Sequence, residues 1–386
     1  MRDFGQAPFL VIWEVTQACD LACAHCRACA VPVRHPLELT TAEGCRLLET
    51  VRSFGDPLMV FTGGDPLKRP DLQALLERSV ALGLRTTVTP SATPLLGVEA
   101  IAGFERAGVA RMAVSLDGPD AATHDGFRRV EGSFARTLFA LDEARRLGLE
   151  TQVNTTVTRR NRLRLGEIAD LVERAGARLW SVFFLVTTGR ALAEDDVSAG
   201  EYEEVFAFLY ELSKRAPFDI KTTEAQHYRR YVAQRRKAES NGSTAGAAPP
   251  APGAVARQAG INDGKGLVFI SHTGEIYPSG FLPISAGNVR RDSLAEVYRR
   301  SPLFLALRDS DNLGGKCGRC EYRNLCGGSR SRAYALTGDC LAEDPRCVYQ
   351  PPASPAGAGH TEARAAQRRL RSFRILGDAS SIASRL

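Results

Sequence analysis

The 386-residue chain lacks an apolar run of the roughly 20 residues that a membrane-spanning helix needs. Even the apolar stretch Phe9–Val15 is interrupted by Glu14. A basic stretch followed by an apolar stretch and a small-residue cleavage site is also missing at the N-terminus, so we expect no signal peptide. With 44% hydrophobic and 24% charged residues, the composition is typical of a globular protein. We therefore expect a cytoplasmic location and no membrane partner.

A broad basic surface is missing as well. The net charge is +6, but the segment from His360 to Leu386 holds six arginines against two acidic residues and so carries most of that excess. The remainder of the chain is nearly neutral, and we predict no specific nucleic-acid partner.

No cysteine lies between Cys45 and Cys317, although the chain has ten. A secreted disulfide scaffold is short and cysteine-dense throughout, which excludes that class here. Tight local spacing favours binding of a metal or an iron–sulfur cluster. The two groups are Cys19, Cys23, Cys26, Cys29 and Cys45, and Cys317, Cys320, Cys326, Cys340 and Cys347.

Runs typical of strands and helices alternate through the first half of the chain. Six strands with intervening helices and short loops predict a parallel α/β sheet, which we expect to curve into a barrel or a partial barrel. Ligand sites of such folds gather at the carboxyl ends of the strands. The expected strands are 9–15, 58–62, 85–89, 112–116, 151–157 and 179–186, and the expected helices are 42–54, 71–82, 98–107, 133–147 and 165–175.

Composition divides the chain further. Residues 1–232 are expected to form the barrel. Residues 233–258 are poor in large apolar side chains, so we expect a disordered insert. Residues 259–350 are expected to form a small cysteine-rich domain that opens with a hairpin turning at Thr273-Gly274. The basic tail, 351–386, is expected to be disordered.

Cys19, Cys23 and Cys26 form a C-x3-C-x2-C pattern directly after the first expected strand. Three thiolates can hold three irons of a [4Fe–4S] cluster and leave the fourth iron open, whereas most clusters have four cysteine ligands. An open iron can bind a further ligand, as a catalytic zinc does through its vacant position. Two alternatives stay open: a zinc site, and a cluster closed by Cys29.

This pattern, together with Gly63-Gly64-Asp65-Pro66 after the second strand, resembles the radical S-adenosylmethionine (SAM) superfamily. The resemblance implies a partial (β/α)6 barrel, a [4Fe–4S] cluster on the three cysteines, and SAM bound to that cluster. The family usually carries Glu where this chain has Asp65. His25 is expected to pack beside the SAM adenine. The other residues expected to bind SAM are Gly63, Gly64, Asp65, Pro66, Ser115, Asp117, Arg128 and Asn154.

The C-terminal cysteines resemble the SPASM or twitch domain of the same superfamily, which carries auxiliary clusters. Five cysteines suffice for one auxiliary [4Fe–4S] cluster and not for two. Cys340 competes with Cys347 for the last ligand position. A structural zinc ribbon, whose C-x2-C element looks alike, stays open as an alternative. The expected ligands are Cys317, Cys320, Cys326 and Cys347.

Two segments, Trp13–Thr16 and Cys326–Ala335, look most like the alternative haem biosynthesis branch of the superfamily. The resemblance implies reductive cleavage of SAM to a 5′-deoxyadenosyl radical, which abstracts hydrogen from the substrate. It also implies a one-electron reductant such as flavodoxin or ferredoxin. An auxiliary cluster favours a net oxidation, such as decarboxylation of a tetrapyrrole side chain.

Three other functions stay open. Peptide maturation would use the same radical chemistry on a different substrate. A non-catalytic iron–sulfur electron-transfer protein and a zinc-stabilised binding module belong to other classes. No catalytic side chain beyond the cluster ligands is assigned.

Overall fold

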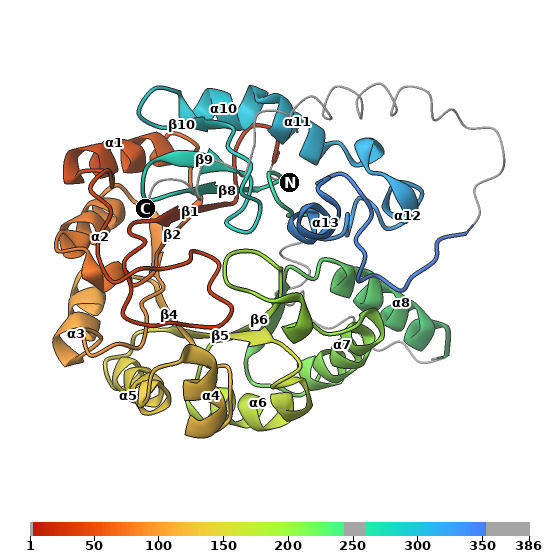
Figure 1. Ribbon diagram of the computed structural model, residues 1–386, viewed down its shortest axis with the longest axis horizontal. Coiled ribbons are helices and arrows are strands. Elements are labelled where there is room, and N and C mark those ends of the chain that lie inside the picture. Colours follow the sequence, from red (N-terminus) through yellow and green to blue (C-terminus); the bar gives the residue numbers. More distant parts are fainter. Residues whose placement is uncertain (1–2, 243–259, 353–386) are drawn as a thin grey trace.

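A computed structural model describes residues 3–242 and 260–352 of the chain (Figure 1). One sheet runs through it in the order β10-β9-β8-β1-β2-β3-β4-β5-β6-β7. All pairs from β8 to β7 are parallel, and the β8–β9 and β9–β10 pairs are antiparallel. The strands are β1 (Leu10–Glu14), β2 (Leu58–Thr62), β3 (Arg85–Val88), β4 (Arg111–Ser115), β5 (Thr151–Val157), β6 (Leu179–Phe184), β7 (Asp219–Thr223), β8 (Leu267–Ile270), β9 (Glu275–Tyr277) and β10 (Gly287–Asn288).

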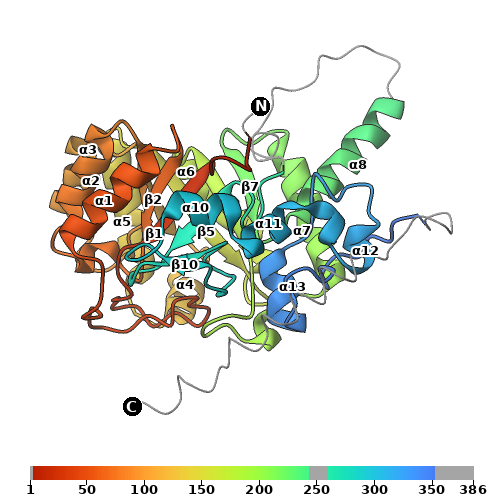
Figure 2. The same cartoon turned by 90° about the horizontal axis from the view of Figure 1, so that it is seen from above.

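Helices cover the outside of this curved sheet, and the C-terminal helices lie beside its two ends (Figures 1 and 2). Within the described residues no helix is both long and apolar enough to cross a bilayer. The helices are α1 (Thr41–Arg52), α2 (Leu72–Ala81), α3 (Val98–Arg106), α4 (Ala121–Arg128), α5 (Ser133–Arg146), α6 (Leu165–Arg174), α7 (Ala199–Ser213), α8 (His227–Gly242), α10 (Leu294–Arg300), α11 (Pro302–Arg308), α12 (Gly315–Gly318) and α13 (Arg330–Thr337).

Side chains alternate across the strands because successive residues of a strand point to opposite faces. Trp13, Phe61 and Trp180 point outward and are fully buried under the helices. Helix α1 approaches Trp13 closely at Gly44, where an added Cβ would lie 2.6 Å from the indole ring. The alternate residues face the interior of the curved sheet, which we call the lumen.

The expected partial barrel is confirmed. The six predicted strands are present as β1–β6, but β7 was not predicted because its sequence, Asp-Ile-Lys-Thr-Thr, has one apolar residue and lies at the sheet edge. The sheet does not close between β7 and the C-terminal strands. A buried residue of α13, Arg332, instead donates to the carbonyls of Leu185 and Glu224, just beyond β6 and β7, and pairs with Asp344 at 3.2 Å.

Two expected boundaries differ from the structure. Strand β8 pairs in parallel with β1, so the cysteine-rich segment extends the barrel sheet and does not form a separate layer. Residues 233–242, expected to begin the insert, belong to α8, which is tied to α7 by Tyr210–Glu239 and Lys214–Glu239 contacts of 2.7 and 2.9 Å. Residues 243–258 of the expected insert and 353–386 of the expected tail lie outside the described residues.

Candidate functional site

The loop after β1 brings Cys19 and Cys23 into one buried cluster, and the half-buried Cys26 packs against it. The Leu21 N–H donates to Cys19 Sγ at 3.3 Å and the Ala30 N–H donates to Cys26 Sγ at 3.4 Å. Such donors stabilise negative charge on sulfur, which a metal-binding thiolate requires. Burial raises the pKa of the Cys19 thiol to about 11, so this thiol needs a bound cation to ionise at neutral pH. The donor set therefore fits an iron–sulfur cluster.

Cys29 differs from these three residues. Its side chain is exposed, and its backbone adopts φ +47°, a left-handed conformation. Cys29 thus differs in exposure from the buried Cys19 and Cys23, although only two residues lie between it and Cys26.

Arg128, at the end of α4, connects the cysteine loop to the end of β4. Its guanidinium donates to Cys23 Sγ at 3.5 Å and forms an ion pair with Asp117. Burial would raise the pKa of Asp117, but Arg128 and neighbouring histidines hold it below its usual value. Asp117 also accepts the Thr156 N–H at 2.7 Å. Both residues predicted to bind SAM therefore already have protein partners.

Gly63 and Gly64 lie against the chain that leads into the cysteine loop. An added Cβ would lie 2.5 Å from the Thr16 carbonyl oxygen at Gly63 and 2.5 Å from the Ala18 carbonyl oxygen at Gly64. The Gly64 N–H also donates to the Thr16 carbonyl at 2.8 Å. We expected these glycines to let backbone approach a ligand; what they approach in the structure is the segment that positions Cys19.

The carboxylate of Asp65 is fully buried and satisfied by protein donors. It accepts from Thr93 Oγ1 at 2.7 Å and from the Ser91 and Leu67 N–H groups at 3.3 and 3.2 Å. Burial raises its pKa. Ser91 in turn lies 3.5 Å from Cys19 Sγ, so Asp65 supports the cysteine loop through Ser91. Pro66 begins the short 3₁₀ helix Pro66–Lys68.

The other predicted SAM residues lie toward the lumen or beside it. Ser115 and Asn154 are register partners on β4 and β5, and Asn154 accepts from Gln152 at 2.7 Å. The His25 ring stacks on Phe127 with centroids 4.2 Å apart. Its Nδ1 is buried without a hydrogen-bond partner.

Sequence reasoning missed Arg190, which follows β6. Its N–H donates to the Cys26 carbonyl at 2.9 Å, and its guanidinium donates to the Cys23 and Ala30 carbonyls at 3.0 and 3.1 Å. Beside it, Gly189 has φ +62° and comes so close to Cys26 that an added Cβ would lie 2.3 Å from that carbonyl oxygen. No local sequence pattern marks this arginine, because its partners are backbone carbonyls more than 150 positions earlier in the chain.

Arg27, within the cysteine loop, was also missed. It pairs with Glu14 at 2.5 Å and donates to the Gly280 carbonyl at 3.2 Å, while its guanidinium lies 4.7 Å from the centre of the Phe269 ring. Glu14 lies 2.8 Å from His272 as well. These contacts join the cysteine loop to β1 and to the C-terminal part of the sheet.

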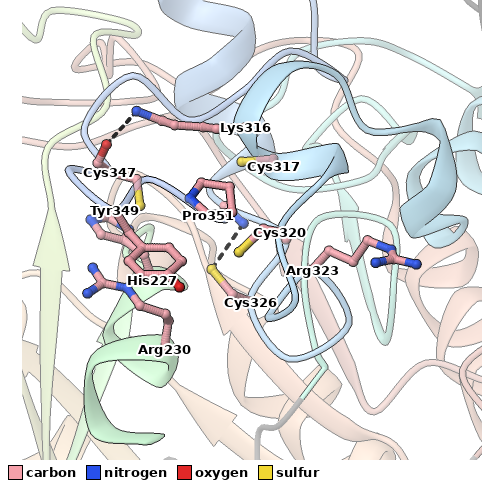
Figure 3. Close-up of a pocket in the computed structure, with 12 residues that line it drawn as sticks. His227, Arg230, Lys316, Cys317, Cys320, Arg323, Cys326, Cys347, Tyr349 and Pro351 are labelled. Atoms are coloured by element: carbon pink, nitrogen blue, oxygen red, sulfur yellow. Dashed lines mark hydrogen bonds between the residues drawn. The ribbon is translucent and has the colours of Figure 1, made fainter. Parts of the chain in front are cut away.

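Four C-terminal cysteines line one pocket (Figure 3). Cys317, Cys320 and Cys326 come from α12 and the loop after it, and Cys347 comes from the last described segment. Within the described part of the chain, no three or more His, Cys, Asp or Glu side chains are placed to hold a single metal ion. The cations Arg230 and Lys316 also line the pocket and suit a negatively charged occupant, as a cluster with four thiolate ligands is.

Cys340 is not among the residues that line this pocket. It is buried in an apolar cluster with residues such as Leu303 and Leu341, and burial raises its pKa to about 12. Of the two cysteines that competed for the last ligand position, Cys347 is the one that shares the pocket.

Comparison with known proteins supports a family assignment. Residues 13–172 match the family model described as the radical SAM superfamily. An AdoMet-dependent heme synthase of Oleidesulfovibrio alaskensis is 42% identical over 358 residues, which cover 92% of this chain and 91% of the relative. A relative of the same name from Nitratidesulfovibrio vulgaris is 43% identical over 344 residues, covering 89% and 92%. The crystal structure of Streptococcus suis SuiB bound to S-adenosylmethionine has a TM-score of 0.70 at 16% identity, covering 89% of this chain and 78% of SuiB.

The chain therefore belongs to the radical SAM superfamily. It is an enzyme of that class, and within the class its relatives include AdoMet-dependent heme synthases. Its cofactors are a [4Fe–4S] cluster and SAM, as expected, and the cysteine-rich region that an auxiliary cluster requires is present.

A pair of alanine variants tests the ligand set of the first cluster. Cys26→Ala should abolish formation of 5′-deoxyadenosine from SAM in anaerobically reduced protein, because it removes one of the three expected ligands of the cluster. Cys29→Ala should leave that activity within about twofold of the unmodified protein, because small effects at exposed positions are the rule. Loss of activity in both variants would place Cys29 among the ligands.

Substitution of Arg190 tests whether it holds the cysteine loop. Arg190→Ala removes two side-chain hydrogen bonds, roughly 2 kcal/mol of local stability at about 1 kcal/mol each. In a background lacking Cys317, Cys320 and Cys326, we expect less iron and sulfide per chain and faster loss of the cluster in air. Arg160→Ala, which removes an exposed ion pair with Asp195, serves as the control; equal cluster contents in both variants would contradict the role of Arg190.

Proposed function

We propose that this enzyme oxidises the carboxylate-bearing side chains of a tetrapyrrole, and that it does so by decarboxylation. The observation that carries the proposal is the 42–43% identity to two AdoMet-dependent heme synthases over nearly the whole of both chains. A peptide substrate is the alternative, because SuiB has also been solved with its precursor peptide bound. That likeness is at 16% identity, which extends to the fold alone.

Cys19, Cys23 and Cys26 would hold the first cluster, with one iron left for SAM. When bound, the cluster supplies the electron that cleaves SAM, and the adenosyl fragment takes a hydrogen atom from the substrate. The protein contributes orientation and exclusion of water. Arg190, Arg27 and Arg128 hold the loop that carries the sulfurs.

The two sides of the lumen differ in polarity. On β1 and β2 the inward residues include Ile12 and Val60, which are apolar. On β4 to β7 one row of register partners is polar throughout: Ser115, Asn154, Ser181 and Lys221. A flat macrocycle with carboxylates at its edge presents the complementary surfaces, since its faces are apolar and its rim is anionic.

Lys221 is the cation on the polar side of the lumen. Its neighbour Ile220 belongs to the hydrophobic core, so Lys221 points the opposite way, into the lumen. Burial, with a smaller effect of Arg111, lowers the pKa of Lys221 to about 8. No ion pair joins it to a carboxylate among the described residues, so an anion from the substrate would gain a charge-assisted partner there.

In the proposed reaction each propionate side chain is oxidised in two steps. A propionate loses a hydrogen atom from the carbon attached to the ring. The bond to its carboxylate then breaks, carbon dioxide leaves, and one electron leaves the substrate as the vinyl group forms. The pocket of Cys317, Cys320, Cys326 and Cys347 is the proposed place for a cluster that accepts this electron.

Turnover of a defined substrate tests the proposed function. Reduced enzyme is incubated anaerobically with SAM and an iron tetrapyrrole that carries propionates, and the products are analysed by mass spectrometry. We expect loss of carbon dioxide and two hydrogens per converted side chain, with 5′-deoxyadenosine formed in step. SAM cleavage without any change to the tetrapyrrole would contradict the proposed substrate but not the family assignment.

The pKa of Lys221 predicts a pH dependence of substrate binding. Because its pKa is lowered to about 8, the charge is present at pH 7 and is lost as the pH rises through 8. We expect affinity for the tetrapyrrole, measured by absorbance titration, to fall about tenfold between pH 7 and 9, the equivalent of about 1.4 kcal/mol for one charged hydrogen bond. Lys221→Arg should bind equally well at both pH values, and Lys221→Met should bind weakly at both. A pH-independent affinity in the unmodified enzyme would exclude Lys221 from the binding site.

A further inference from the structure

His227, the first residue of α8, is fully buried, yet neither of its ring nitrogens has a hydrogen-bond partner. Its nearest acid is Asp344, whose Oδ2 lies 3.6 Å from Nδ1, beyond hydrogen-bond range. Buried polar groups in folded proteins are almost always satisfied. A histidine with two unsatisfied nitrogens therefore indicates a partner that is not part of the polypeptide.

The ring is packed against two aromatic side chains. It stacks on Tyr202 with centroids 5.3 Å apart, and Phe206 packs edge-on against it at 4.8 Å. On the Nδ1 side, Asp344 already accepts the Ser329 N–H at 2.9 Å and pairs with Arg332 at 3.2 Å. That side of the ring thus faces an ion pair whose members are already satisfied, which leaves Nε2 for a different partner.

The same ring lines the pocket of the four C-terminal cysteines (Figure 3). The connection is close, because the Asp344 N–H donates to Cys317 Sγ at 3.4 Å while Asp344 Oδ2 lies beside the imidazole. Whatever the cysteines hold therefore lies in a pocket that His227 also lines. Four cysteines provide one ligand for each iron of a cubane cluster, so no iron is left for the imidazole. The sulfur atoms of such a cluster, however, can accept hydrogen bonds.

We propose that an N–H of the His227 ring donates a hydrogen bond to a sulfur of the auxiliary cluster, and that this bond raises the reduction potential of the cluster. The inference rests on the auxiliary cluster proposed above. A hydrogen bond to sulfur stabilises the added negative charge of the reduced form, and such bonds are among the factors that set cluster potentials. His227 thus acts on electron transfer indirectly. By raising the reduction potential, it makes the auxiliary cluster a better acceptor for the electron that leaves the substrate.

The test uses the full chain with Cys19, Cys23 and Cys26 replaced by Ala, so that only the auxiliary cluster remains. In this background, His227→Phe keeps an aromatic ring but removes the donor, and His227→Gln keeps an N–H donor. Phe206→Leu changes the packing around the ring without changing a donor and serves as the control. Iron and sulfide content, the midpoint potential of the cluster, and the coupling of exchangeable protons in pulsed electron paramagnetic resonance are measured for each.

We expect about four irons per chain in all of these proteins. The potential should shift to more negative values in His227→Phe and recover at least in part in His227→Gln, with Phe206→Leu unchanged. An exchangeable proton coupled to the cluster should be present in the parent and absent in His227→Phe. If His227→Phe does not retain its cluster, the test rests on the parent protein alone. Absence of the exchangeable-proton coupling in the parent then overturns the proposal.

Two further outcomes would also overturn it. Equal potentials in the parent and His227→Phe would mean that the ring does not contact the cluster. A strong nitrogen coupling in the parent would make His227 an iron ligand and not a donor. If the parent itself contained zinc and no iron, the proposed auxiliary cluster would fail, a result separate from failure of the hydrogen bond alone.

Discussion

The structure depends on how the three-cysteine loop is held, because this loop has little regular structure of its own. Its backbone is fixed from several strand ends at once: by Gly63 and Gly64 after β2, and by Arg190 after β6. Its own residue Arg27 reaches β1 and the C-terminal part of the sheet. Together these attachments hold the loop in the conformation that would place three sulfurs around one cluster, with a corner left for SAM. The barrel is therefore the means by which distant parts of the chain position one short loop.

A second constraint is the opening in the sheet. Among the described residues, no further strand pairs with β7. The C-terminal segment contacts this edge of the sheet through buried charged side chains and not through strand pairing. Arg332 reaches the ends of β6 and β7 and pairs with Asp344, and Asp344 touches both Cys317 and His227. A buried ion pair is costly to form and more costly to break from one side. The same residues that contact the open edge of the sheet thus also shape the pocket of the four C-terminal cysteines.

Much of the fold could be predicted from the sequence, because hydrophobic periodicity marks elements that bury one face. The strands β2 and β5 begin and end where expected, and the predicted helices agree within a few residues. The edge strand β7 and the helix α8 could not be predicted, since Lys221 and the charged residues of α8 are placed by tertiary contacts. In the site, spacing was sufficient to predict that Cys317, Cys320, Cys326 and Cys347 lie together, since they line one pocket. The contacts of Arg190, Arg27 and His227 could not be predicted, because each depends on partners far away in the chain. Gly63 lies against the segment that leads to Cys19, and the Asp65 carboxylate is connected to the cysteine loop through Ser91.

We propose that the N-terminal cluster has three protein ligands and one iron reserved for SAM. The decisive experiment is electron paramagnetic resonance of the reduced protein, in a variant that lacks Cys317, Cys320 and Cys326, recorded with and without SAM. We expect a cluster whose spectrum changes on addition of SAM, with hyperfine coupling from the methionine nitrogen of isotopically labelled cofactor. A spectrum that SAM leaves unchanged would mean that SAM does not bind to an iron of this cluster.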